Sequence, residues 1–169
     1  PAIVQHSYVS FARFSGDGTK IASSSWDGAV RVGDPRGGVP RRVGAGALAK
    51  YSVALDRPGD RVAFGGSDSD PRVVIVSLTD GRRVVLTGHT EIVWAIDFSR
   101  DGKHVVTASE DGTARIWDAQ SGRLERTLEG HGEGVTTARY SPDGRWLFFN
   151  AHAPAVTFAV TGPCAEGGL

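Results

Sequence analysis

Apolar and polar residues alternate with a period of two between Gly88 and Asp118, which is the spacing of a half-buried β-strand. Two Asp-Gly pairs, Asp101-Gly102 and Asp111-Gly112, divide this stretch into three alternating segments. Asp-Gly supplies the positive φ angles of a tight turn, so each pair between alternating segments indicates an antiparallel hairpin. The pattern therefore predicts three consecutive strands joined by two short turns.

The same pattern recurs along the chain at a fixed interval. His89 is matched by His131, and Asp101-Gly102 by Asp143-Gly144, in both cases 42 residues later. Going back by 84 residues, twice that interval, Asp101-Gly102 maps onto Asp17-Gly18. A fixed period indicates a repeat architecture, in which neighbouring units bury one another's apolar faces. The expected repeats cover about 1–35, 36–78, 79–118 and 119–160, and a flexible tail is expected at 161–169.

The four repeats retain the pattern to different degrees. The first keeps both turns but has Gly33 at the position of the closing Trp117. The second is the weakest, because Asp56-Arg57-Pro58-Gly59 replaces its first turn and residues 67–71 lengthen its second. The fourth loses its second turn to Ala153-Pro154. Since no segment has the 3.6-residue apolar period of a helix, the prediction is an all-β fold with under about a tenth helix.

The third repeat resembles one repeat of the WD-repeat β-propeller family. It opens on Gly88-His89, carries Ser99 and Asp101-Gly102 at its first turn, and closes on Trp117-Asp118. The family period is roughly 40–45 residues. The resemblance implies four blade equivalents, in which each repeat contributes the outermost strand of one sheet and the three inner strands of the next. The expected flanking strands are Ala2–Gln5, as an outer strand, and Val156–Val160, as the last inner strand.

Two assemblies follow from a propeller segment with four blade equivalents. The chain is either a fragment of a larger propeller or half of a two-chain ring of eight blades. In the ring, a homodimer would form because Ala2–Gln5 of one chain completes the last sheet of the other. The uncharged run Trp146–Ala165 would supply apolar surface to that contact.

Composition narrows the classes of partner. The net charge is zero, with 19 basic and 19 acidic residues, so no nucleic acid or membrane partner is predicted. Cys164 is the only cysteine, which excludes an intrachain disulfide. The chain also opens without a signal-peptide pattern, and a cytoplasmic location is therefore expected.

The third repeat contains a set of polar side chains: a histidine, a carboxylate, a hydroxyl and an indole. Taken alone, such a set could indicate a nucleophilic triad, but no G-x-S-x-G turn presents the serine. The resemblance implies instead a structural hydrogen-bond network that links the strands of one blade. Thr107 and Ser109 share a face by parity, so the sequence leaves both open as the hydroxyl, and Thr107 is favoured. The full candidate set is His89, Thr107, Ser109, Asp111 and Trp117.

Other motifs indicate no cofactor or metal. Asp68-Ser69-Asp70 lacks the remaining ligands and the distal glutamate of a calcium loop. Gly44-Ala45-Gly46 lacks the third glycine and the helix of a dinucleotide fingerprint. The histidines are dispersed without metal-ligand spacing.

Three residues occupy equivalent positions immediately before the second turn of their repeats: Trp26, Glu110 and His152. The resemblance implies that this turn lies on the face where partners dock. Glu91 and Glu133, each two residues after a Gly-His pair, should lie at the rim of that face. An indole there either contacts a partner as a hot spot or packs against the neighbouring blade.

These features predict a non-catalytic scaffold for protein-protein interaction, with a protein or peptide partner. A second hypothesis is a sensory or regulatory propeller of a larger signalling protein that also contains an NTPase or kinase domain. A third is a hydrolase that uses the propeller centre, although no convergent carboxylates or metal ligands are visible in the sequence.

Overall fold

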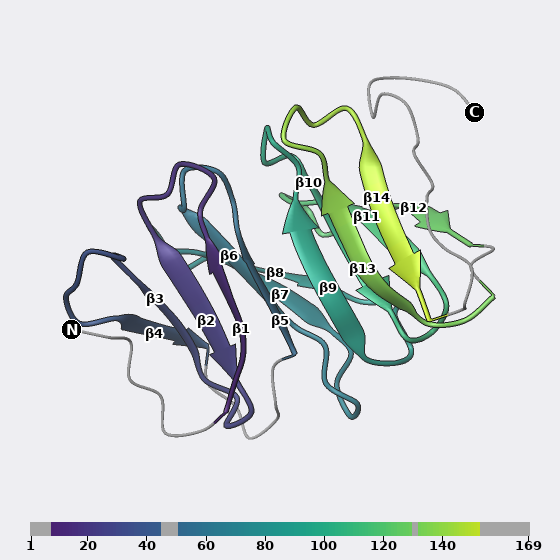
Figure 1. Ribbon diagram of the computed structural model, residues 1–169, viewed down its shortest axis with the longest axis horizontal. Coiled ribbons are helices and arrows are strands. Elements are labelled where there is room, and N and C mark those ends of the chain that lie inside the picture. Colours follow the sequence, from purple (N-terminus) through teal and green to yellow (C-terminus); the bar gives the residue numbers. More distant parts are fainter. Residues whose placement is uncertain (1–7, 45–50, 130–131, 153–169) are drawn as a thin grey trace.

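The computed structural model describes residues 8–44, 51–129 and 132–152, and it consists of antiparallel β-strands without a helix in this part of the chain (Figure 1). Three sheets contain four strands each, and a fourth contains two described strands. The prediction of an all-β propeller segment with four blade equivalents is therefore confirmed. The first sheet contains β1 (Val9–Phe14), β2 (Ile21–Ser25), β3 (Val30–Gly33) and β4 (Arg41–Gly44); the second β5 (Ser52–Leu55), β6 (Arg61–Gly65), β7 (Val73–Ser77) and β8 (Arg83–Leu86); the third β9 (Val93–Phe98), β10 (His104–Ser109), β11 (Ala114–Asp118) and β12 (Leu124–Leu128); and the fourth β13 (Val135–Tyr140) and β14 (Leu147–Ala151).

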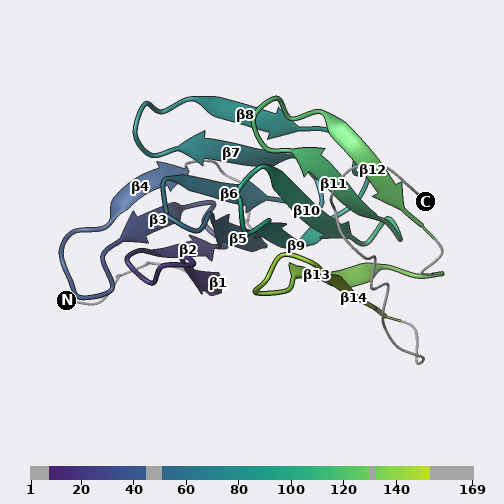
Figure 2. The ribbon, with the colours of Figure 1, turned by 90° about the horizontal axis from the view of Figure 1, so that it is seen from above.

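The sheets lie side by side as neighbouring blades. Figure 2 shows the innermost strands β1, β5, β9 and β13 along one side, with β4, β8 and β12 along the other. Each four-stranded sheet is a meander in chain order, so its last strand belongs to the sequence repeat that follows. The strands expected at Ala2–Gln5 and Val156–Val160 lie outside the described residues. No helix in the described ranges has the length and apolar character needed to cross a membrane.

Strand direction divides the loops between two faces of the molecule. The first turn of each sheet, such as that between β9 and β10, lies on one face, which we call the first-turn face. The second turns, such as that between β10 and β11, lie on the opposite face with the connections to the following sheet. We call this the second-turn face. In the orientation of Figure 1, the first-turn face is at the top and the second-turn face at the bottom.

The first turn owes its shape to one serine and one aspartate. In the third sheet, the Gly102 N–H donates to Ser99 O at 2.9 Å, and Gly102 has a φ of 71°, which favours glycine. Ser99 Oγ donates to Asp101 Oδ1 at 2.7 Å and accepts the His104 N–H at 2.9 Å. In the second sheet Asp56 takes the place of the serine and accepts the N–H groups of Asp60 and Arg61 at 2.8 and 2.9 Å. The divergent second repeat therefore keeps the same turn by different chemistry.

Apolar side chains form one core cluster at each boundary between neighbouring sheets. The first boundary buries Val30 and Val32 against Val53, Val62 and Phe64. At the second, Ile75 and Leu86 pack against Phe98, Val105 and Trp117. At the third, Val106 and Ile116 pack against Ala138, Leu147 and Phe149. Burial of each large side chain contributes about 1.5–3 kcal/mol, so contacts between sheets supply much of the stability.

Polar contacts on the first-turn face link each sheet to the next. Lys20 Nζ donates to Gly59 O at 2.8 Å, Arg61 Nη2 to Gly102 O at 2.6 Å, and Arg100 Nη1 to Pro142 O at 2.7 Å. Each of these cations thus extends from the first turn of one sheet to the first turn of the next. The basic residues on this face consequently fix the relative position of neighbouring sheets.

Candidate functional site

The third sheet contains a continuous chain of hydrogen bonds between buried side chains. Trp117 Nε1 donates to Thr107 Oγ1 at 2.8 Å, and Thr107 Oγ1 lies 2.7 Å from His89 Nε2. His89 Nδ1 lies 2.7 Å from Asp111 Oδ2. Thr107 is therefore the hydroxyl in this chain, whereas Ser109 Oγ donates to Glu91 O at 3.1 Å and lies outside it.

The hydrogen-bond partners define the histidine tautomer. Since Thr107 Oγ1 already accepts the indole N–H, its own proton points to His89 Nε2, and Nδ1–H donates to Asp111. Burial lowers the pKa of His89 below its ordinary value of 6.5, although the Asp111 carboxylate acts in the opposite direction. The imidazole is therefore neutral at pH 7.

The buried His89 predicts a loss of stability on mild acidification. Below pH 6.5 the unfolded chain binds a proton that the folded chain excludes, so the free energy of unfolding should fall as the pH decreases toward the lowered folded pKa. The slope should reach up to about 1.4 kcal/mol per pH unit, which corresponds to one proton. Urea titrations between pH 7.5 and 5 measure this slope.

The control for this pH dependence is His89→Gln. This variant should be less stable at pH 7.5 and should show a flatter pH dependence, since His104 and His152 remain in both proteins. An unchanged slope in His89→Gln would contradict the assignment of the proton to His89.

The same set of residues is unsuited to nucleophilic catalysis. The Thr107 side chain is completely buried, and His89 and Ser109 are also buried, so a substrate has no access to these groups. The Thr107 hydroxyl accepts the Trp117 N–H, and its own proton is directed to His89. The hydrogen-bond partners of these groups lie within the folded sheet.

The equivalent sets in the first and fourth repeats are only partly described. In the first sheet Ser25 Oγ donates to Asp27 Oδ1, which also accepts the Ala29 N–H at 3.0 Å. Gly33 replaces the tryptophan there. His6 and His131 lie outside the described residues.

On the second-turn face, the residue before the second turn is held by the same backbone hydrogen bond in three sheets. The N–H of Trp26 donates to Tyr8 O at 3.0 Å, that of Glu110 to Ile92 O at 2.9 Å, and that of His152 to Gly134 O at 3.0 Å. The three residues thus occupy equivalent places in the first, third and fourth sheets. The second sheet differs, because the Ser67 N–H donates to Asp70 O within the lengthened turn, and Ser67 is buried.

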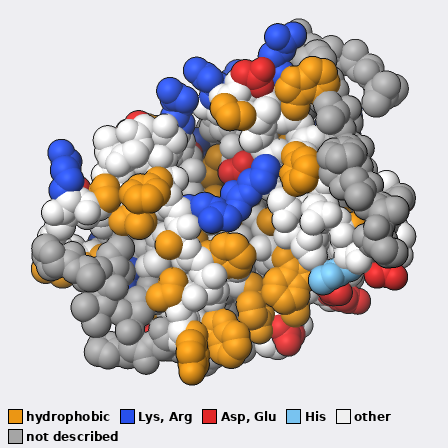
Figure 3. Space-filling view, in the orientation of Figure 1, with side chains coloured by type: hydrophobic (Ala, Val, Ile, Leu, Met, Phe, Trp, Pro, Cys, Tyr) orange, Lys and Arg blue, Asp and Glu red, His pale blue; other side chains and the backbone are white. Residues whose placement is uncertain are grey.

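Two aromatic side chains of the first sheet are exposed together on this face. Trp26 is 56% exposed and Tyr8 is 79% exposed, and their ring centroids are 5.8 Å apart. The ring partner of Trp26 thus belongs to its own sheet, and the residue remains more than half exposed. Figure 3 shows hydrophobic side chains along the lower margin of the molecule, ending beside a histidine and acidic groups.

A second group of side chains on the same face connects the second, third and fourth sheets. The ring of Tyr51 lies 5.4 Å from that of Trp94, and Trp94 Nε1 donates to Glu110 Oε2 at 2.6 Å. His152 Nε2 lies 3.6 Å from the same Glu110 oxygen. Burial raises the pKa of Tyr51, and the neighbouring Asp68 carboxylate adds to this shift. Glu91 and Glu133 are exposed in the loops beside this group.

Sequence reasoning missed Tyr8, Tyr51 and Trp94. These three aromatic residues are spaced at intervals of 43 residues, close to the repeat length, and this spacing could have identified them. Trp94 is the extra residue of a β-bulge, because Ser109 pairs with Val93 and Ala108 with Ala95. A bulge redirects the side chain that it contains.

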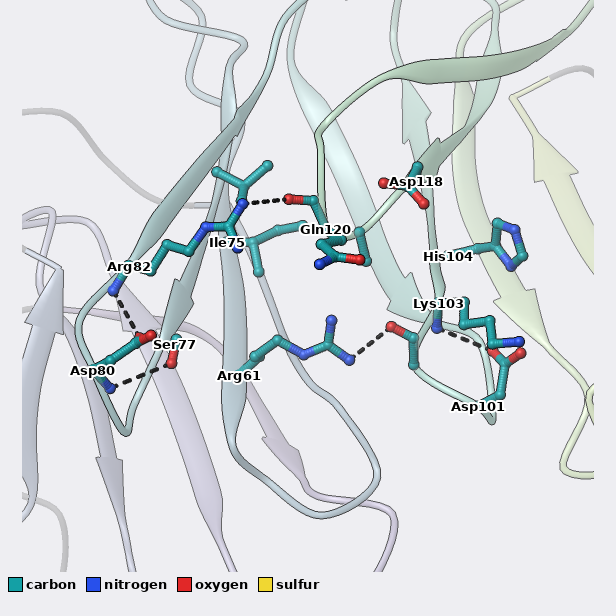
Figure 4. Close-up of a pocket in the computed structure, with 13 residues that line it drawn as sticks. Arg61, Ile75, Ser77, Asp80, Arg82, Asp101, Lys103, His104, Asp118 and Gln120 are labelled. Carbon is teal, nitrogen blue, oxygen red and sulfur yellow. Dashed lines mark hydrogen bonds between the residues drawn. The ribbon is translucent and has the colours of Figure 1, made fainter.

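The first-turn face has a cleft of about 540 Å³ between the second and third sheets (Figure 4). Arg61 and Arg82 extend from the second sheet across this cleft. They donate to Gly102 O at 2.6 Å and to Gln120 O at 3.2 Å respectively. These two contacts join the second sheet to the third.

A smaller hollow of about 280 Å³ lies on the first-turn face, where the inner strands β1, β5, β9 and β13 end. Asp97 is the only carboxylate among the described residues that line it. Burial raises the pKa of Asp97, while the Tyr140 N–H, which donates to it at 2.9 Å, and the nearby Arg139 act in the opposite direction. A hydrolase of the two-carboxylate type would need a second acid here. No group of three His, Cys, Asp or Glu side chains in the described part of the chain is arranged to hold a metal ion.

Comparisons with known proteins agree with this architecture. The family described as WD domain, G-beta repeat matches residues 2–34, 81–118 and 122–162. The chain is 37% identical over 130 residues to WD repeat-containing protein RUP2 of Arabidopsis thaliana, which covers 73% of this chain and 35% of that protein. It is 30% identical over 129 residues to the ribosome biogenesis protein WDR12 homolog of Nematostella vectensis, covering 74% of this chain and 31% of that protein.

The chain therefore belongs to the WD-repeat family. It spans about a third of the length of these curated relatives. The ranges matched by the family leave out residues 35–80, which hold the repeat with the most altered turns.

Proposed function

We propose that this chain is part of a non-catalytic scaffold that binds a protein or peptide on its second-turn face. The observation that carries the proposal is the exposed pair Trp26 and Tyr8, at the edge of a face built from equivalent loops of successive sheets. An exposed indole and phenol together offer a large apolar area that has little conformational freedom to lose. The WD-repeat relatives and the absence of a substrate path to His89 and Thr107 support this proposal.

The structure favours the hot-spot interpretation of Trp26 over packing between blades. Its ring partner is Tyr8 of the same sheet, and Trp26 is absent from all three core clusters between sheets. Loss of the side chain should therefore leave the folded core intact and remove contact area from a partner.

Replacing Trp26 with alanine should weaken partner binding by about 2 kcal/mol or more, the scale of an interface hot spot. A peptide display library selected on the chain supplies the ligands, and calorimetry measures their affinities for the original and changed proteins. The melting temperature of Trp26→Ala should change little, because Trp26 is 56% exposed.

Trp146→Ala is the matched control for this experiment. Trp146 is 45% exposed and lies immediately before β14 on the first-turn face, so its loss should leave binding unchanged. A large fall in the melting temperature of Trp26→Ala, with unchanged affinity of the folded fraction, would contradict the proposal that Trp26 binds a partner.

A further inference from the structure

The two faces of the molecule differ in charge, although the whole chain has a net charge of zero. Among the described loops of the second-turn face, the one arginine is Arg72, which pairs with Asp70 at 2.7 Å. At the adjoining end of β11, Arg115 Nη2 lies 3.8 Å from Asp111 Oδ2. The described loops of this face also contain acidic side chains from all four sheets. Six of them form no salt bridge with a described Lys or Arg: Asp27, Asp68, Glu91, Glu110, Glu129 and Glu133.

The first-turn face carries both aspartates and basic side chains. Its aspartates are engaged within the turns themselves, since Asp17, Asp101 and Asp143 each accept a backbone N–H at 3.0 Å. Basic side chains reach across the sheet boundaries of this face: Lys20, Arg61, Arg82 and Arg100. The described loops of the second-turn face therefore carry an excess of negative charge, which the zero net charge of the whole chain conceals.

Aromatic rings lie among the acidic groups of the second-turn face. Tyr51 and Trp94 form a tilted ring pair, and Trp26 and Tyr8 form another at the neighbouring inner strand. Trp94 faces this surface because it is the bulged residue of β9. A cation beside an aromatic face gains about 0.5–2 kcal/mol from the ring quadrupole, and an indole gives the largest effect.

Glu110 is held in place beside this aromatic surface. One of its carboxylate oxygens accepts the indole N–H of Trp94 at 2.6 Å, and the carboxylate lies over Gly134, where a Cβ atom would approach it to 2.7 Å. The glycine thus leaves room for the glutamate side chain between the third and fourth sheets. A fixed carboxylate next to an indole provides both components of a site for an ammonium or guanidinium group.

We propose that the partner of the second-turn face is a polypeptide segment that contains Lys or Arg, with one cationic side chain against Trp94 and paired with Glu110. This inference rests on the proposed function and specifies the chemistry of the partner. Glu91 and Glu133 lie in the loops beside the site and attract the rest of the segment through longer-range charge. An acidic segment or a nucleic acid would be repelled by the same carboxylates.

Three peptide probes of 12 residues test the proposal: alternating Lys-Ser, the same peptide with every lysine acetylated, and alternating Glu-Ser. Fluorescence anisotropy on the full chain should give an affinity for the Lys-Ser peptide at least about tenfold higher than for the acetylated peptide. The Glu-Ser peptide should bind no better than the acetylated one. Raising the salt concentration should weaken binding of the Lys-Ser peptide selectively, since surface charges are screened.

Glu110→Gln should reduce the affinity for the Lys-Ser peptide by about tenfold, because the amide has the shape of the carboxylate without its charge. Glu125→Gln is the matched control, since Glu125 pairs with His104 at 3.2 Å near the first-turn end of β12, and it should bind as the original protein does. Glu91→Gln and Glu133→Gln, both at exposed positions, should slow association by smaller factors and keep the fold. They test the charge of the face even where Glu110→Gln impairs folding.

Equal affinity for the lysine and acetyl-lysine peptides would overturn the proposal, as would full binding by Glu110→Gln, Glu91→Gln and Glu133→Gln. Display-selected ligands that require Trp26 but contain no Lys or Arg would overturn it while supporting the scaffold proposal. Ligands whose binding is insensitive to Trp26→Ala would instead count against the scaffold proposal itself.

Discussion

Replacing Trp117 with alanine should lower the free energy of unfolding by about 3–5 kcal/mol, the range for removal of a fully buried aromatic side chain. Trp117 is 1% exposed and lies in the core cluster between the second and third sheets, with Ile75 and Val105. Its loss leaves a cavity at a boundary between sheets and removes the donor to Thr107 at 2.8 Å. Urea denaturation at pH 7.5 measures the change.

Two further variants separate the causes of this effect. Trp117→Phe keeps most of the apolar contact but removes the N–H, so it should cost less than Trp117→Ala and still exceed about 1 kcal/mol. Trp146→Ala removes the same side chain at a position that is 45% exposed, and it should cost well under half as much as Trp117→Ala. Equal losses at Trp117 and Trp146 would show that burial at the sheet boundary is unimportant for stability.

Replacing Asp111 with alanine should destabilise the chain by about 1–3 kcal/mol, because it leaves buried donors without an acceptor. Asp111 accepts hydrogen bonds from the backbone N–H groups of Thr90 and Thr113 at 3.2 and 3.0 Å, and its Oδ2 lies 2.7 Å from His89 Nδ1. The side chain of Asp111 is 6% exposed, so water cannot easily replace these contacts. Burial acts to raise the pKa of Asp111, but the hydrogen bonds from Thr113 and His89 outweigh it and lower the pKa.

Asp80→Ala is the control for the change at Asp111. Asp80 lies in an exposed turn of the second sheet, where its carboxylate accepts the Arg82 N–H at 3.0 Å. Its removal should cost far less, because water can hydrate the freed N–H group. Equal destabilisation by the two changes would contradict a structural function of the network around His89.

The turns and strands could be predicted from the sequence because their causes are local. Asp101-Gly102 and Asp111-Gly112 specify tight turns through the positive φ angles of their glycines, and the residues between them alternate as a sheet requires. The second repeat shows the limit of this reasoning. Its first turn has an unfamiliar sequence, yet Asp56 performs the hydrogen bonding of the serine found in the other sheets.

The hydrogen-bond network around His89 shows that alternation along a strand does not by itself identify which hydroxyl takes part. Thr107 and Ser109 have the same parity, and the bulge at the start of β9 shifts the register of β10 between Ala108 and Ser109. Thr107 lies beside His89, whereas Ser109, on the far side of the shift, contacts the Glu91 carbonyl. The position of a bulge depends on how the facing strand is fitted, and residue alternation does not encode it.

The sequence by itself determined the repeat period, the all-β class, the family resemblance and the candidate residues, since all of these depend on turn chemistry and apolar spacing along the chain. Only the tertiary structure decided that Trp94, Tyr51 and Glu110 form one group, and that acidic residues gather on one face while basic residues bridge the sheets of the other. The physical reason is that each face of the molecule is formed by loops from different sheets. Their proximity depends on strand direction and on the packing of neighbouring sheets, which residue spacing within one repeat does not specify.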